Sequence, residues 1–252
     1  MVVFSCAHEW EAMLSCIYEA WSSKIGFQNI RLELEPLGQQ TIFDEYRHVE
    51  ADSDKAEGVM DAVIKKISYY VYQELSFSAM AYESDILDNI YHVMILGFRL
   101  GSEVLNMVQY RDVARNQEIR TRLSRETCRF KEVARFHRIP GDIFVAHVEP
   151  KSKIVVTLGP VFSDRMPSEH WMVVDDVHRE AVIHVKNEPW FLKQLSEEEY
   201  ERLLLTEEEN DGYTDLWKVF FDTIAIKERA NARCQRTLFP IWARKHAVEF
   251  MN

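Results

Sequence analysis

The sequence lacks the short motifs that mark most familiar catalytic sites. It has no glycine-rich phosphate loop, no HExxH zinc motif, no GxSxG elbow, no kinase signature and no three-cysteine cluster for an iron–sulfur centre. Its four cysteines are scattered without a CxxC pair, which favours reduced thiols over a disulfide framework or a zinc site. We therefore expect no cofactor, and the sequence leaves open whether the chain is an enzyme.

The sequence also lacks an apolar run of about 18 residues, the length needed to cross a bilayer. Its first residues contain no basic leader or cleavage site. We therefore expect a cytoplasmic protein with no membrane contact. With 252 residues, of which 47% are hydrophobic, the chain can bury a large core. We expect residues 1–252 to form a single compact unit; the alternative is a subdivision into a helical part (1–110), an α+β part (111–190) and a second helical part (191–252).

Hydrophobic spacing of the helical period predicts most of the secondary structure. A first helix is expected at residues 9–21, and two or three helices between 53 and 100. Further helices are expected at 111–132 (charged), 152–165, 195–210 (acidic), 213–238 and from Pro240 to the end.

Strand signals are fewer and shorter. Residues 30–36 alternate apolar and charged side chains, and residues 46–51 are their candidate partner. Within 133–187, four runs rich in β-branched and aromatic residues predict two antiparallel pairs on either side of the helix at 152–165. The predicted fold is α+β: mostly helical, with a small antiparallel sheet in the middle of the chain.

Charge is distributed unevenly along this acidic chain. The net charge is −11, yet residues 223–246 carry six basic residues and one acid, a balance of 6 − 1 = +5. If 213–238 is one helix, Arg229, Arg233 and Arg236 share a face, and we call these three residues the arginine stripe. Arginine presents a planar fork of donors that suits phosphate. The candidate nucleic-acid site therefore comprises Arg229, Asn231, Arg233, Gln235, Arg236 and Arg244.

Two observations bear on this interpretation. The acidic segment 197–209 directly precedes the stripe and can pair with it on the surface, in which case the stripe is structural. A second basic region, 111–138, has a balance of 9 − 4 = +5 and adds to the segregation of charge. Pairs within a helix, Glu118 with Arg122 and Glu126 with Arg129, explain that region as a solvated face.

A second candidate site, for a divalent metal or a phosphate, lies after an apolar strand. It comprises Arg165, Asp175, Asp176, His178 and Arg179. A hairpin turn stabilised by Asx hydrogen bonds explains the same residues. His137 and His147 are expected at opposite ends of a hairpin, with Glu149 on the face of His147, as half-buried polar residues.

Four segments carry a resemblance to a known family: WEAMLSCIYEAW near the start, LGFRLG at 96–101, the run 134–176, and IKERANARCQRTLFP at 226–240. They resemble a largely uncharacterised bacterial family assigned to DNA metabolism or DNA repair. The genes of its members typically lie beside the gene for a radical S-adenosylmethionine (SAM) protein assigned to DNA modification or repair, and some members are fused to a uracil-DNA-glycosylase-like domain. The resemblance implies a DNA-related role and a radical SAM partner.

The family's C-terminal signature falls in the basic segment. It matches Ile226, Glu228, Arg229, Asn231, Arg233, Gln235 and Pro240. After the proline, where members place a basic residue and a tyrosine, this sequence has Ile241, Trp242 and Ala243 before Arg244. Two function classes follow: a DNA-repair or DNA-metabolism factor that binds nucleic acid through the stripe and works with a radical SAM enzyme, or a protein–protein adaptor with no nucleic-acid contact of its own.

Overall fold

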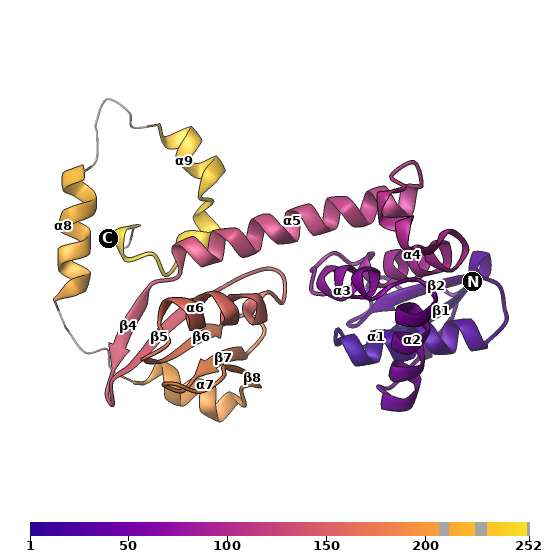
Figure 1. Ribbon diagram of the computed structural model, residues 1–252, viewed down its shortest axis with the longest axis horizontal. Helices are drawn as coiled ribbons and strands as arrows, with labels where there is room; N and C mark the ends of the chain where they lie inside the picture. The colour runs from indigo at the N-terminus through magenta and orange to yellow at the C-terminus, as the bar shows by residue number, and fades with distance from the viewer. Residues whose placement is uncertain (207–211, 225–230, 251–252) are drawn as a thin grey trace. The chain divides into compact units, whose positions relative to one another are not determined.

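The computed structural model describes residues 1–206, 212–224 and 231–250 (Figure 1). The chain divides into two compact units, Met1–Leu123 and Ser124–Asn252, and each is described by itself. Helix makes up 53% of the protein and strand 17%, so the prediction of a mostly helical α+β fold is confirmed. None of the described helices is long and apolar enough to pass through a bilayer.

The first unit contains a small sheet and most of the predicted helices. Its elements are β1 (Val2–Cys6), α1 (Trp10–Ser22), β2 (Ile30–Leu34), β3 (Glu45–His48), α2 (Ser53–Lys66), α3 (Tyr69–Ser78) and α4 (Ile86–Leu100). Helix α5 (Arg111–Val133) begins here and continues into the second unit. The helices predicted at 9–21, between 53 and 100, and at 111–132 are confirmed.

The sheet of the first unit was only partly predicted. Its order is β2-β1-β3, and both outer strands run parallel to β1. The predicted pairing of 30–36 with 46–51 is therefore wrong, because β1 lies between them. Strand β1 is nearly all buried, with Val3 and Cys6 fully so. A central strand of this kind reads as a short continuous apolar run without alternation, which is why periodicity did not reveal it.

The second unit is built on a larger sheet. Its strands are β4 (Phe136–Ile139), β5 (Ile143–Val148), β6 (His170–Asp175), β7 (Glu180–His184) and β8 (Phe191–Gln194). Its helices are α6 (Gly159–Arg165), α7 (Glu197–Leu204), α8 (Tyr213–Ile224) and α9 (Ala232–Leu238), with 3-10 turns η3 (Val155–Leu158), η5 (Ile241–Arg244) and η6 (Val248–Phe250).

This sheet is mixed, so the predicted small antiparallel sheet is wrong. The two predicted strand pairs, β4 with β5 and β6 with β7, are antiparallel as expected. The strand order is β4-β5-β6-β7-β8, which makes β5 and β6 parallel neighbours. The cause is the segment η3–α6, which connects β5 to β6 and acts as the crossover that a parallel pair requires.

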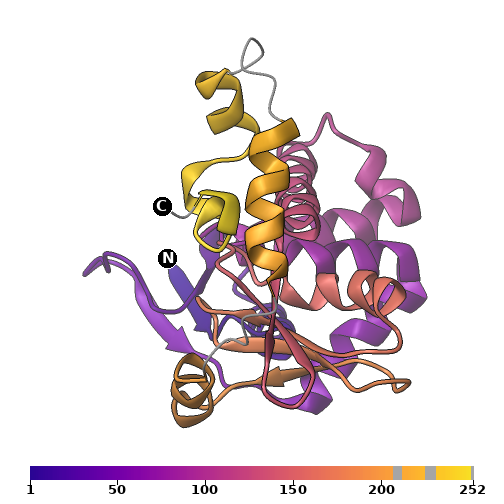
Figure 2. The ribbon, with the colours of Figure 1, turned by 90° about the vertical axis from the view of Figure 1, so that its left-hand side faces the viewer.

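Helices α6 and α7 cover opposite faces of this sheet (Figure 2). On the α6 side, Phe162 meets the ring of Trp171 at 6.1 Å. On the α7 side, Tyr200 packs into a cluster with Val145 and Val174. Because side chains alternate along a strand, Trp171 and Val174 of β6 point to opposite faces. The sheet is therefore a rigid layer that holds the ends of its strands in place.

The C-terminal region departs most from the predicted helices. The single helix predicted at 213–238 is wrong, because Asn231 has extended backbone angles (φ −136°, ψ 91°) and its side chain accepts a hydrogen bond from the backbone N–H of Cys234. Asn231 is thus the N-cap of a new helix, α9. After Pro240, the 3-10 turns η5 and η6 replace the predicted helix. The acidic helix is confirmed over Glu197–Leu204.

Candidate functional site

Two carboxylates lie next to each other where the parallel strands of the second unit end. Glu149 directly follows β5 and Asp176 directly follows β6. The pairing register places Val148 opposite Asp175, and the backbone N–H of Asp176 donates to the carbonyl of Val148 at 3.0 Å. The carboxyl ends of adjacent parallel strands are a common place for ligand sites in α/β sheets.

The C-terminal segment brings His246 to these two carboxylates. Its Nε2 atom lies 3.2 Å from Glu149 Oε1 and 3.3 Å from Asp176 Oδ2. We call Glu149, Asp176 and His246 the carboxylate–histidine cluster. Each of the three residues is partly buried, and their ligand atoms all lie within 4.8 Å of one another. The cluster therefore joins three segments that are far apart in the sequence.

Two further side chains contact the cluster. His147 Nδ1 lies 2.8 Å from the other carboxylate oxygen of Asp176, and the His147 ring stacks on His137 at 5.8 Å. The predicted placement of these two histidines at opposite ends of a hairpin is wrong, because His137 pairs with Val145, two residues from His147. Lys245 Nζ lies 2.6 Å from Glu149 Oε1, and this hydrogen bond raises the pKa of Lys245.

Of the predicted metal or phosphate residues, only Asp176 belongs to this cluster. Asp175 is fully buried, and its Oδ1 accepts hydrogen bonds from the backbone N–H groups of Val177 and His178 at 2.9 and 3.0 Å, the Asx pattern of a turn. The Asp175 Oδ2 atom lies 2.7 Å from His178 Nδ1. Asp175 and His178 therefore hold the β6–β7 turn together.

The two arginines of that predicted site also have structural contacts. The guanidinium of Arg179 lies 3.5 Å above the ring of Tyr200 and donates to the carbonyl of Asp176. Arg165 donates to the carbonyl of Lys131 at 3.0 Å. The structure thus does not gather the five predicted residues around one ligand.

The predicted nucleic-acid residues fall into two groups. Arg233, Gln235 and Arg236 lie on α9, which buries none of its residues. Neither Arg233 nor Arg236 forms an ion pair with any residue that the structure describes; Arg236 Nε donates to the carbonyl of Ala232. Arg229 lies outside the described residues.

Asn231 and Arg244 are committed to the fold. Asn231 caps α9 through its side chain. Arg244 donates to the carbonyl of Phe239 at 2.7 Å, and its guanidinium lies 4.7 Å from the ring of Phe250. Both side chains serve the C-terminal segment itself, although Asn231 is exposed. The other exposed residues of the predicted site that the structure describes are Arg233, Gln235 and Arg236.

The acidic helix α7 has other partners than the stripe. Glu197 lies 3.8 Å from Arg179 and Glu199 lies 2.5 Å from Lys193. Within the described part of the segment 197–209, which ends at residue 206, no carboxylate pairs with Arg233 or Arg236. Glu197 and Glu199 are thus paired with the β6–β7 turn and with β8.

Three of the seven basic residues of α5 form ion pairs with carboxylates among the described residues, although not as predicted. Arg115 forms a bidentate pair with Asp85 at 2.8 and 2.9 Å, and Arg122 lies 3.6 Å from Glu83. The predicted pairs of Glu118 with Arg122 and Glu126 with Arg129 are wrong. Glu118 lies beside Arg115 instead. Glu126 is buried and accepts hydrogen bonds from the loop after β5.

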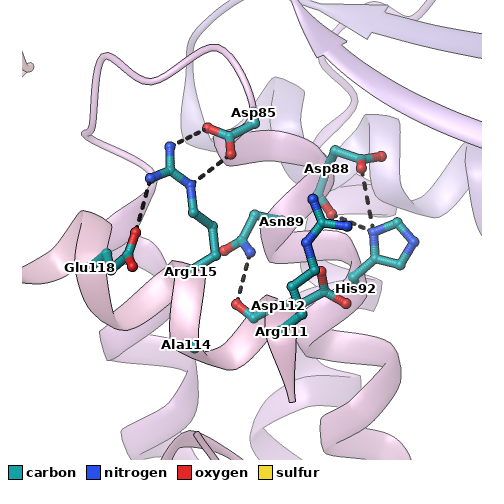
Figure 3. A pocket seen from close by; sticks show the side chains of 9 residues that line it. All are labelled: Asp85, Asp88, Asn89, His92, Arg111, Asp112, Ala114, Arg115 and Glu118. Carbon is teal, nitrogen blue, oxygen red and sulfur yellow. Dashed lines mark hydrogen bonds and ion pairs between the residues drawn. The ribbon is translucent and has the colours of Figure 1, made fainter. Parts of the chain in front are cut away.

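A hollow lined by charged side chains lies in the first unit, between α4 and the start of α5 (Figure 3). It measures about 650 Å³ and is lined by Asp85, Asp88, Asn89, His92, Arg111, Asp112, Ala114, Arg115 and Glu118. The hydrogen bond from Arg115 lowers the pKa of Asp85, and the contact with Asp88 raises the pKa of His92. Most of these charged side chains are paired with one another, so the hollow offers a ligand few charged groups without a partner.

A family model with the description "Domain of unknown function (DUF4130)" matches residues 84–249. The chain belongs to the DUF4130 family. The DUF4130 match begins just before α4 and includes both the charged hollow and the whole carboxylate–histidine cluster. It leaves out the three-stranded sheet of the first unit. No curated protein matches the chain.

Sequence reasoning missed His246 and the role of Glu149 in this DUF4130 chain. A signal existed: each of two β-branched runs, FVAHVE and MVVDD, ends directly in a carboxylate. These two carboxylates indicate a shared site only if the two strands are parallel neighbours. The signal was missed because the two strands had been assigned to separate antiparallel pairs. His246 lies 70 residues after Asp176, and no local spacing links them.

Proposed function

We propose that the chain is a DNA-repair or DNA-metabolism factor that binds nucleic acid through Arg233 and Arg236 and works with a radical SAM enzyme. The DNA-related context and the partner come from the family resemblance of the sequence. The observation that supports nucleic-acid binding is the exposure of these two arginines, without a carboxylate partner among the described residues, on a helix that buries nothing.

The physical argument concerns unpaired positive charge in an acidic chain. In a protein of net charge −11, carboxylates are abundant, and three of the six arginines of α5 pair with one among the described residues. Arg233 and Arg236 are three residues apart, so they share one face of α9. Two guanidinium forks on one face suit consecutive phosphates of a nucleic-acid backbone, and the exposed amide of Gln235 can add a polar contact.

The double substitution R233Q/R236Q tests this proposal. Because two phosphate contacts are lost, we expect DNA affinity to fall about tenfold for all sequences alike, and the slope of log K against log salt to decrease by about 1.8 on duplex DNA. Fluorescence anisotropy with labelled single- and double-stranded oligonucleotides at several salt concentrations measures both quantities.

The matched control is R99Q/R202Q, which removes the same charge from two other exposed helical arginines. Arg202 donates to the carbonyl of Glu198, as Arg236 does to that of Ala232. The control should bind DNA like the unchanged protein. If both double variants lose DNA affinity equally, the effect is due to net charge and not to a specific contact. If R233Q/R236Q loses no affinity, the proposed contact is refuted.

A second feature favours contact with a protein partner. Leu216, Val219, Phe220 and Ile224 of α8 share one helical face and are 51–64% exposed. Apolar side chains gathered on one exposed face commonly mark a protein–protein interface. This face supports the alternative function, an adaptor that docks a protein, and it is the surface we assign to the radical SAM partner.

Association with the partner is tested by L216D/V219D. Charge placed on the apolar face should abolish copurification of the coexpressed radical SAM protein, because burying two carboxylates without partners is strongly unfavourable. The control I42D/F43D changes two residues that are 92% and 87% exposed outside α8 and should leave copurification intact. If the unchanged pair of proteins does not associate, or if L216D/V219D associates normally, the assignment of this face is wrong.

A further inference from the structure

We propose that Glu149, Asp176 and His246 bind a divalent transition-metal ion of the Zn²⁺ type. This site is separate from the arginines of α9 and from the apolar face of α8, so it does not depend on the function proposed above. It would give the second unit a metal centre at the end of its only parallel strand pair among the described residues.

The position of the cluster is that of a ligand site. Glu149 and Asp176 extend from the carboxyl ends of β5 and β6, which the sheet holds in register. Ligands of α/β sheets commonly bind outside the carboxyl ends of parallel strands. Two carboxylates fixed there at close range repel each other unless a cation lies between them. His246 completes the set from a third segment.

The two distances from His246 to the carboxylates fit a metal ion. In a tetrahedral zinc site with ligands at about 2.0–2.1 Å, neighbouring ligand atoms are about 3.3 Å apart. His246 Nε2 lies 3.2 Å from the Glu149 oxygen and 3.3 Å from the Asp176 oxygen. A cavity of about 10 Å³ lined by Glu149 and His246 adjoins the cluster, close to the volume one water needs.

The donor set fits the same class of ion. One imidazole nitrogen and two carboxylate oxygens suit borderline divalent ions, and three protein ligands leave a fourth position open. The second oxygen of Asp176 is held by His147 at 2.8 Å, which fixes the orientation of the ligating carboxylate. Lys245 occupies Glu149 as a competing cation, but its side chain is 66% exposed and free to move away.

A hydrogen-bonded ion pair explains the distances from His246 to the two carboxylates less well than a metal site does. One N–H on Nε2 points to one acceptor, and charged hydrogen bonds of this kind are usually about 2.7–2.9 Å long. His246 instead lies at 3.2 and 3.3 Å from two oxygens through the same nitrogen. His48 shows the contrast: it also contacts two carboxylates, but Glu35 lies at Nδ1 and Glu50 at Nε2. A metal ion binds a single ring nitrogen. The two carboxylates beside His48 lie at different nitrogens, so they cannot both bind the same ion as the His48 ring.

Metal binding is measured on the full chain without an affinity tag. Calorimetry with Zn²⁺ should give one site per chain, and Co²⁺ should give the visible absorption of a low-coordinate N/O site. The substitutions D176N and H246Q should each weaken Zn²⁺ binding by about 100-fold or more, since even outer partners of a metal site contribute 10–100-fold. The control H48Q removes a histidine with two carboxylate neighbours and should bind Zn²⁺ unchanged.

A third variant separates a metal site from a structural ion-pair cluster. K245A removes the competing cation from Glu149, so Zn²⁺ should bind about twofold to fivefold more tightly. X-ray absorption of the unchanged protein with Zn²⁺ should show nitrogen and oxygen ligands without sulfur; sulfur would indicate binding by the exposed Cys128 or Cys234. These two measurements decide the question if D176N or H246Q does not fold. Absence of Zn²⁺ binding, sulfur ligation, or unchanged binding in folded D176N and H246Q would overturn the proposal.

Discussion

Replacing Asp175 by alanine is expected to lower the free energy of unfolding of the second unit by about 3 kcal/mol. The carboxylate is fully buried and accepts hydrogen bonds from two backbone N–H groups and lies 2.7 Å from His178 Nδ1. Alanine removes this acceptor from two partly buried backbone N–H groups and removes the contact of the His178 ring, and an unsatisfied buried donor costs about 1–3 kcal/mol before water re-enters the turn. Hydrogen-exchange mass spectrometry on peptides of β6 and β7 measures the loss within this unit.

Two companion substitutions test the reason given for this loss. D175N keeps an oxygen that can accept from the N–H groups of Val177 and His178, as an Asx turn allows, and should lose only about half as much. D164A removes an exposed aspartate of α6 and should change stability by less than about 0.5 kcal/mol. If D175N is as damaging as D175A, the hydrogen bonds of the turn are not the main contribution.

The sequence predicted those parts of the fold whose signal is local. Helices such as α1 and α5 have apolar side chains at helical spacing, and their positions agree with the prediction within a residue or two. Strand neighbours are not a local property. The register of β5 beside β6 depends on the crossover through α6, and β1 is central only because two later strands add to its edges.

The C-terminal segment shows the same limit for a candidate site. Its arginines were assigned to one helical face, but Asn231, a residue type that favours N-caps, begins a new helix instead. Arg244 was assigned to phosphate by its charge, whereas the structure places it between Phe239 and Phe250. The charge composition identified this segment as unusual. Only the structure shows that its arginines on α9 are exposed, whereas His246 contacts the carboxylates at the ends of β5 and β6.

The loop that follows β5, beside the carboxylate–histidine cluster, is held by a contact that was also predicted wrongly from the sequence. Glu126 of α5 is 7% exposed and was predicted to pair with Arg129 on the helix surface. Its Oε1 instead accepts from the backbone N–H of Lys151 at 2.6 Å, and its Oε2 accepts from the Ser152 hydroxyl at 2.7 Å. Ser152 is itself buried, so Glu126 fixes the loop that leaves β5 just after Glu149.

The substitution E126A should therefore destabilise the second unit by about 2–4 kcal/mol, because the partly buried N–H of Lys151 and the buried hydroxyl of Ser152 lose a charged acceptor. E126Q retains one acceptor oxygen and should lie between E126A and the unchanged protein, whereas E132A, on the exposed side of the same helix, should have almost no effect. Guanidinium unfolding together with hydrogen exchange in the loop at residues 149–153 measures both the size and the location of the loss. Protection lost throughout the chain, but not first in this loop, would show that Glu126 stabilises α5 itself and does not anchor the loop beside the carboxylate–histidine cluster.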